Sequence, residues 1–181
     1  MRIAALLLAV LAFAAPAAEA KTFLSRDEAL ALAFPKAKFA RETFFLSPEQ
    51  RKEIARRSGV EMEAELVIRY RAVVDGKTAG WAYFDAHRVR TLPETLMIVV
   101  GPETTIERIE IVAFAEPEDY LPRPRWLDQF EGRKLDDELS LRGAIRPITG
   151  ASLSGRAVVS AARRTLALHE VLESGGAARR K

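Results

Sequence analysis

The sequence predicts an α+β fold, in which helices flank a twisted antiparallel sheet and a long helix closes the chain. Three observations support this prediction. Segments between residues 65 and 114 alternate apolar and polar side chains, a hairpin turn signal separates two of them, and residues 153–172 carry apolar side chains three and four positions apart. The length suits one domain, and a chain without cysteine must bury its core without disulfides.

Residues 1–20 have the pattern of a secretory signal peptide. Arg2 precedes an apolar run over residues 3–15, and the small residues up to Ala20 suit cleavage after that position. The apolar run is shorter than the roughly 20 residues that cross a bilayer as a helix. We therefore expect an exported, periplasmic protein without a membrane span after cleavage, in which residues 21–181 form a single domain.

Two short helices are predicted at the start of this domain. Ser25 and Glu28 form a capping-box pair in front of the first helix. Ser47 followed by Pro48 is typical of the start of the second helix, which should end near Gly59.

The predicted sheet begins with a strand over residues 39–46. In residues 65–73 the apolar side chains alternate with Glu65, Arg69 and Arg71, which places these three on the polar side of that strand. A turn at Asp75-Gly76 then returns the chain. The remaining strands are predicted over residues 80–87, 95–100 and 106–114.

Prolines keep residues 116–126 largely irregular, and the length of this segment favours a functional loop. The last helix is predicted near residues 153–172. Its basic residues Arg163 and Arg164 lie off the apolar stripe, and the basic residues 179–181 are expected to be a frayed tail. The net charge of only +3 predicts no nucleic-acid partner.

The most unusual segment is residues 147–156, where hydroxyl and small side chains precede the last helix. The start of a helix presents free N–H groups and a partial positive charge, so it can hold a phosphate. Gly150 and Ala151 would let the phosphate approach closely, and a neighbouring hydroxyl could bond to it or be esterified by it. The simpler interpretation is that Ser152 only caps the helix.

The sequence Thr149-Gly150-Ala151-Ser152-Leu153-Ser154 resembles the Ser/Thr-Gly-Ala-Thr/Ser-x-Thr/Ser signature of the FMN-binding domain. That family includes the periplasmic FMN subunits of Na⁺-translocating NADH:quinone oxidoreductase and of Rnf complexes. Residues 109–117, which include Glu116, and residues 130–134 are similar to further elements of the family. The resemblance extends over residues 65–172.

The resemblance implies that FMN is the cofactor and that a flavin transferase, using FAD, joins it to Ser154 through a phosphoester. It also implies an electron carrier rather than an enzyme that turns over a substrate, with a redox partner such as a membrane oxidoreductase complex. The family usually has aspartate at the position of Arg146, where the transferase is thought to read it. Arg146 or Arg156 is a candidate for neutralising the phosphate.

A flavin ring needs apolar walls and polar contacts at its edge. Tyr120, Trp126 and Phe130 could form such a wall, although Trp126 and Phe130 are four residues apart and equally suit the apolar stripe of a short helix. Glu94 and Thr95 enter the most buried strand, where they could meet the flavin edge or simply begin that strand.

Other chemistry has weaker support. The segment from Gly150 to Ser154 lacks the final glycine of the hydrolase motif Gly-x-Ser-x-Gly, and His169 precedes the acids where a hydrolase would have it follow them. His87 and His169 lack the spacing of a metal site and are expected at the surface or its boundary, and the acidic groups lack the spacing of a calcium loop, so no metal is predicted. Two rivals to the electron carrier are a flavin-free interaction module and a flavoenzyme acting on a small periplasmic substrate.

Overall fold

The computed structural model describes residues 21–175 and 178–180. The predicted signal peptide, residues 1–20, lies outside the described residues. Within the described part, no helix has both the length and the hydrophobicity needed to cross a membrane.

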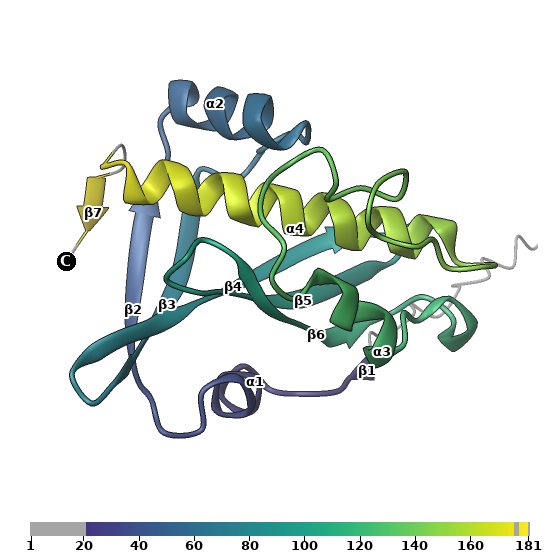
Figure 1. The fold of residues 1–181 in the computed structure, drawn as a ribbon, viewed down its shortest axis with the longest axis horizontal. Coiled ribbons are helices and arrows are strands. Elements are labelled where there is room, and N and C mark those ends of the chain that lie inside the picture. Colours follow the sequence, from purple (N-terminus) through teal and green to yellow (C-terminus); the bar gives the residue numbers. More distant parts are fainter. Residues whose placement is uncertain (1–20, 176–177, 181) are drawn as a thin grey trace, which may run out of the picture.

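The fold is built on one seven-stranded sheet in the order β1-β6-β5-β4-β3-β2-β7, with antiparallel neighbours throughout (Figure 1). The strands are β1 Lys21–Thr22, β2 Lys38–Phe45, β3 Leu66–Val74, β4 Lys77–Arg88, β5 Pro93–Val100, β6 Ile106–Phe114 and β7 Ala178–Arg180. The predicted α+β class is confirmed. The Asp75-Gly76 turn is confirmed too, because both residues have the positive φ, 50° and 78°, that a tight hairpin requires.

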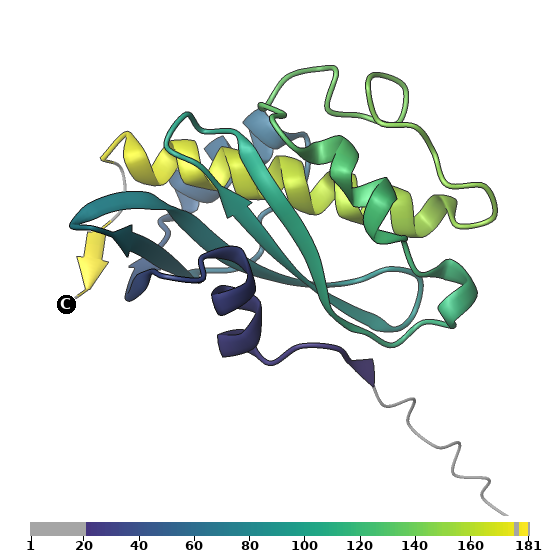
Figure 2. The ribbon, with the colours of Figure 1, turned by 60° about the horizontal axis from the view of Figure 1, so that its bottom comes forward.

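Helices cover both faces of the sheet (Figures 1 and 2). They are α1 Arg26–Ala33, α2 Pro48–Ser58, α3 Pro124–Leu127 and α4 Ser152–Glu173, with 3₁₀ turns at Glu118–Tyr120 and Asp128–Phe130. The first two begin as predicted, since Ser25 and Ser47 each form a capping box with the residue three positions later. Residues 116–126, which were predicted to be largely irregular, contain a 3₁₀ turn and the start of α3.

The sheet separates two hydrophobic cores. The larger core packs α2 and α4 against one face, with Leu96, Ile98 and Leu166 fully buried. The smaller core packs α1 against the other face. The central strands are therefore covered on both faces, and polar side chains on them need hydrogen-bond partners inside the protein.

The placement of Arg69 on a polar side of its strand was wrong. Arg69 is only 2% exposed, because it lies on the face of β3 that α4 covers. The guanidinium donates hydrogen bonds to Glu42 (2.8 Å), Glu173 (2.7 Å) and the Tyr83 hydroxyl (3.2 Å). Buried arginine requires such partners, and the fold supplies them from three other elements.

The prediction that His169 lies at the surface or its boundary was also wrong. His169 on α4 is 1% exposed, and its Nδ1 lies 2.8 Å from the Tyr83 hydroxyl. Burial, together with the nearby Arg69 charge, lowers the pKa of His169 to about 4. The ring is therefore neutral near pH 7, and its Nδ1 shares a hydrogen bond with the Tyr83 hydroxyl.

The C-terminal residues differ from the expected frayed tail. Ala178–Arg180 form β7, which pairs with the outer edge of β2. An unpaired strand edge offers free backbone donors and acceptors, and this short strand satisfies part of the β2 edge.

Candidate functional site

The N-terminal end of α4 has no side-chain cap. The N-cap residue is Ala151, which offers no oxygen to the first-turn amides, so the simpler interpretation of Ser152 as the cap was wrong. Gly150 precedes it with φ of +82°, a conformation that glycine adopts without steric cost. The first-turn N–H groups of α4 are therefore left available to an external acceptor.

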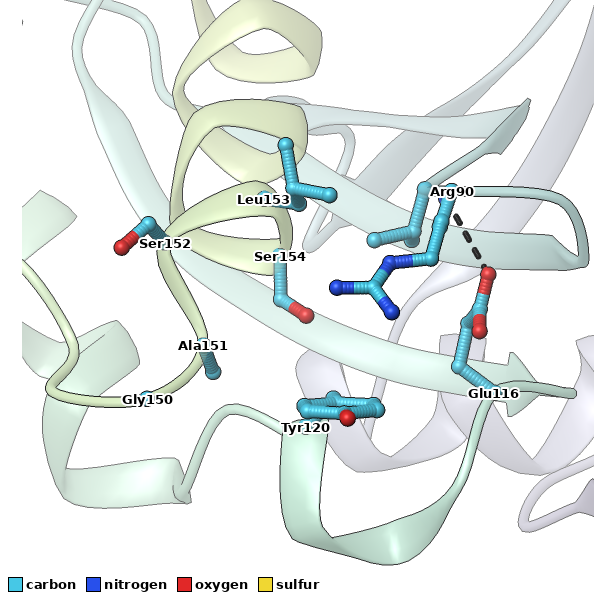
Figure 3. Close-up of a pocket in the computed structure, with 9 residues that line it drawn as sticks. Arg90, Glu116, Tyr120, Gly150, Ala151, Ser152, Leu153 and Ser154 are labelled. Atoms are coloured by element: carbon cyan, nitrogen blue, oxygen red, sulfur yellow. Dashed lines mark hydrogen bonds between the residues drawn. The ribbon is translucent and has the colours of Figure 1, made fainter.

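These amides border a pocket of about 150 Å³ between α4, the β4–β5 turn and the 3₁₀ turn after β6. The pocket brings together most of the residues predicted from the sequence. Its lining consists of Val89, Arg90, Glu116, Tyr120, Gly150, Ala151, Ser152, Leu153 and Ser154 (Figure 3).

Ser154 is the most informative residue of this pocket. It is 1% exposed, and its Oγ has no hydrogen-bond partner in the described part of the chain. The hydroxyl points into the pocket towards Arg90 and Tyr120, whereas the Ser152 hydroxyl points away (Figure 3). A buried polar atom without a partner costs about 1–3 kcal/mol, so its retention calls for an explanation such as a ligand.

Glu116 lies in the pocket but is already occupied. Its Oε1 accepts hydrogen bonds from the backbone N–H groups of Arg90, Thr91 and Leu92, at 3.1, 2.9 and 3.0 Å. Burial alone would raise the pKa of Glu116, but the three amides outweigh it and hold that pKa below its usual range. The carboxylate therefore fixes the β4–β5 turn.

Arg90 is the residue that this turn presents to the site. Its guanidinium lies over the Tyr120 ring at 5.2 Å from the centroid and points towards Ser154 (Figure 3). It makes no ion pair with any side chain that the structure describes. The pocket thus combines a buried hydroxyl, uncapped amides and an available cation.

Several other predicted residues do not line this pocket. Thr149 is exposed beside Gly150. Thr95 lies within β5, paired with Ala86 on one side and Ala113 on the other. Glu94 is fully buried one position earlier, with Oε2 bonded to His87 at 2.9 Å and Oε1 without a partner.

Trp126 belongs to a neighbouring packing unit. Its ring meets Phe130 edge to face, with centroids 5.4 Å apart, and its indole N–H donates to the Arg146 carbonyl oxygen at 2.6 Å. This packing matches the alternative that Trp126 and Phe130 form one apolar stripe. Arg146 and Arg156, the candidates for phosphate neutralisation, do not line the pocket; Arg156 lines a separate hollow on the other side of Ser152.

A larger hollow of about 1190 Å³ lies where β3 and β4 diverge, but its less exposed charged groups, Asp85, His87 and Arg164, have ion-pair partners. His87 bonds Asp85 at 2.8 Å and Glu94 at 2.9 Å, and Arg164 also binds Asp85. Burial alone would lower the pKa of His87, yet these carboxylates raise it to about 9. His87 thus lies at the boundary of the surface, as expected, with its side chain 14% exposed, and these carboxylates hold it as a cation.

The described residues contain no cluster of histidine and acidic side chains that could hold a metal. Among the pocket residues, Val89 and Arg90 were not predicted. The only local signal is the basic sequence Arg88-Val89-Arg90 between two strands. That pattern is common in exposed hairpins, so only the register of β4 and β5 places Arg90 opposite α4.

Comparison with known proteins gives a likeness of fold. The structure is similar to the crystal structure of NqrC from Shewanella oneidensis, with a TM-score of 0.54 and 15% sequence identity, over 82% of this chain and 90% of that one. The chain has an NqrC-like fold. This finding confirms the fold implied by the sequence resemblance. A scan of family models and a search of curated proteins find no match to the sequence.

Proposed function

We propose that this protein is a periplasmic electron carrier that binds FMN at the N-terminal end of α4, with the FMN phosphate esterified to Ser154. One observation carries the proposal: the Ser154 hydroxyl is buried, unpartnered and directed into the pocket that borders the uncapped amides of α4. The NqrC-like fold and the Thr149–Ser154 signature support it.

The pocket residues suit a phosphate. The first-turn amides and the partial positive charge of α4 favour an anion, and the Arg90 guanidinium adds a full positive charge on the opposite wall. Glu116, the one acid among the lining residues, is compensated by three backbone amides. Arg90 therefore replaces Arg146 and Arg156 as the candidate for neutralising the phosphate.

The pocket is too small to enclose a whole flavin. Its volume of about 150 Å³ is below the roughly 300–1,000 Å³ typical of enclosed ligand sites. Leu153, 39% exposed, and Tyr120 provide apolar surface at the pocket for a flat ring. We infer a site that holds the phosphate tightly and leaves the ring accessible to redox partners, as an electron carrier requires.

Attachment would be carried out by a flavin transferase that uses FAD. The Ser154 oxygen would form a bond to the FMN phosphorus, the bond between the two phosphates of FAD would break, AMP would leave, and the hydroxyl proton would be released. Bound FMN would supply one- or two-electron transfer. The predicted signal peptide would direct this protein to the periplasm, where a membrane oxidoreductase complex is the proposed partner.

An electron carrier fits the pocket better than a substrate-turning flavoenzyme. A flavoenzyme needs a general acid or base beside the ring. Within the described lining, Glu116 is engaged by amides and no histidine is present, which leaves the Tyr120 hydroxyl as the candidate for proton transfer to a substrate. The flavin-free interaction module remains the rival, supported by Arg146 in place of the usual aspartate.

The test is the intact mass of the exported protein after co-expression with a flavin transferase. We expect a gain equal to FMN minus one water in the wild type and in Ser152→Ala, whose hydroxyl points away from the pocket. Ser154→Ala should show no gain, and Ser154→Thr should restore it. Ser152→Ala is the matched control because it removes a hydroxyl from the same helical turn.

Other outcomes separate the alternatives. A yellow protein that loses its flavin on denaturation would contradict the phosphoester while keeping FMN binding. A colourless protein with the mass of the bare chain would contradict the flavin function and favour the interaction module. A mass gain that Ser152→Ala abolishes and Ser154→Ala does not would mean that the ester forms on Ser152, which would contradict the assignment to Ser154.

A further inference from the structure

The arginine side chains around the candidate site lack ion-pair partners, whereas most arginines elsewhere have them. We define the arginine rim as Arg90, Arg123, Arg125, Arg142, Arg146 and Arg156, all of which are exposed. None of their side chains makes an ion pair or hydrogen bond with the described residues. Away from the site most arginines are paired; for example, Arg57 binds Glu53 and Glu170, and Arg71 binds Glu42.

The rim residues come from several segments that meet at the α4 N-terminus. Arg90 lines the pocket with Ser154, and Arg142 and Arg156 line the hollow of about 560 Å³ on the other side of Ser152. Arg123 and Arg125 lie at the start of α3, which the bond from the Trp126 indole ties to the Arg146 carbonyl. The unpaired positive charges therefore surround the site.

Acidic residues nearby offset this charge only in part. Glu116 is engaged by three backbone amides, and Glu118 pairs with Lys21 at 2.7 Å. Asp119 and Asp128 are exposed, and so are Asp136, Asp137 and Glu138 in the segment before Arg142. One esterified phosphate would compensate about one of the rim charges, so the surface stays basic when the proposed cofactor is bound.

We propose that the arginine rim is the docking surface for an acidic protein surface, that of the redox partner. The redox identity of this partner rests on the proposed function, whereas the choice of an acidic surface rests on the rim charges. A partner must approach a flavin through the surface around it, and transient redox complexes have small interfaces whose charges steer association. Arginine suits carboxylates because its planar fork forms two parallel hydrogen bonds.

An anionic membrane surface fits the rim less well. Proteins that bind at a bilayer interface insert apolar side chains as well as placing basic ones near the headgroups. Five large apolar side chains of the described residues are exposed. Leu153 is in the site, and Phe45 and Leu66 lie on β2 and β3 at the other end of the sheet. Phe23 follows β1, and Leu32 lies on α1. Among the residues that line the two hollows at the rim, Leu153 is the one large apolar side chain that is strongly exposed, so the rim offers little apolar surface to insert.

The experiment is an amide NMR titration of the exported protein with hexaglutamate, with hexalysine as the opposite-charge control. We expect shifts from hexaglutamate at the rim residues and around Ser152, weakening several-fold as salt rises from low to physiological strength. The double variant Arg142→Glu/Arg156→Glu should weaken binding about tenfold. The double variant Arg41→Glu/Arg108→Glu, on the exposed surface of β2 and β6, makes the same charge change away from the rim and should weaken it less than about twofold.

Three outcomes would overturn the proposal. Hexaglutamate shifts that lie outside the rim, or equal weakening by the two double variants, would mean that only the net charge matters. Sedimentation with vesicles of phosphatidylcholine and phosphatidylglycerol, without hexaglutamate shifts, would assign the rim to a membrane. The titration does not require flavin, so a colourless protein would contradict the proposed function while leaving the docking test valid.

Discussion

The polar groups at the two ends of α4 differ in whether they have hydrogen-bond partners within the protein. At the C-terminal end, His169 and Glu173 join Arg69, Tyr83 and Glu42 in a largely buried network whose members bond one another. At the N-terminal end, a buried hydroxyl has no partner, the amides have no cap and the nearby arginines are unpaired.

This difference separates stability from function within one helix. Polar groups that satisfy one another inside the protein can stabilise the fold but offer little to a ligand. Polar groups without internal partners reduce stability and are available for binding. Substitutions at the two ends should therefore affect different properties.

The largest expected effect comes from removing Arg69. Arg69→Met leaves the buried Glu42 with a weaker set of positive partners and deprives Tyr83 and Glu173 of a donor. We expect the free energy of unfolding to fall by about 3–5 kcal/mol, measured by urea denaturation. Ser154→Ala, at the other end, should instead raise it by about 1–3 kcal/mol, because the substitution removes a buried hydroxyl that has no hydrogen-bond partner. Equal losses in both variants would abolish the distinction between the two ends.

The pH dependence of stability should follow the buried histidines. The native pKa of His169, about 4, is below its unfolded value near 6.5, so the unfolded chain binds the extra proton and stability falls as pH drops from 6.5 towards 4. The native pKa of His87, about 9, is above its unfolded value, so its contribution is complete below pH 6.5 and is lost as pH rises towards 9. Each contributes on the order of 3 kcal/mol, which predicts greatest stability near pH 6.5.

Urea denaturation across this pH range, with one variant for each histidine, measures the two contributions separately. His169→Gln should reduce the fall in the free energy of unfolding below pH 6.5. His87→Gln should reduce the fall above pH 6.5. A wild-type profile without a decline above pH 6.5 would mean that His87 is not held as a cation by Asp85 and Glu94.

The smallest expected effect concerns the turn that presents Arg90. Glu116→Gln removes the negative charge that accepts three backbone hydrogen bonds, which should cost about 1–2 kcal/mol of unfolding free energy. Hydrogen exchange should quicken at the amides of Arg90, Thr91 and Leu92, and leave that of His169 unchanged. If the turn amides stay protected, Glu116 does not position Arg90.

The sequence by itself determined the local features of this protein. The capping box at Ser25, the helix start at Ser47-Pro48, the Asp75-Gly76 turn and the apolar spacing of α4 are signals within a few residues, and each formed as predicted. The motif at Thr149–Ser154 also located most of the candidate site, because its residues are adjacent in the chain.

Only the tertiary structure decided which distant residues meet. Alternation in β3 shows that Arg69 and Tyr70 face opposite ways, but whether each face is buried depends on helices that pack there from elsewhere in the chain. Arg90 likewise faces Ser154 across the pocket only because of the register of β4 and β5 and the hydrogen bonds to Glu116. Local patterns fix conformation over a turn or two, whereas burial and long-range contacts depend on the packing of the whole chain.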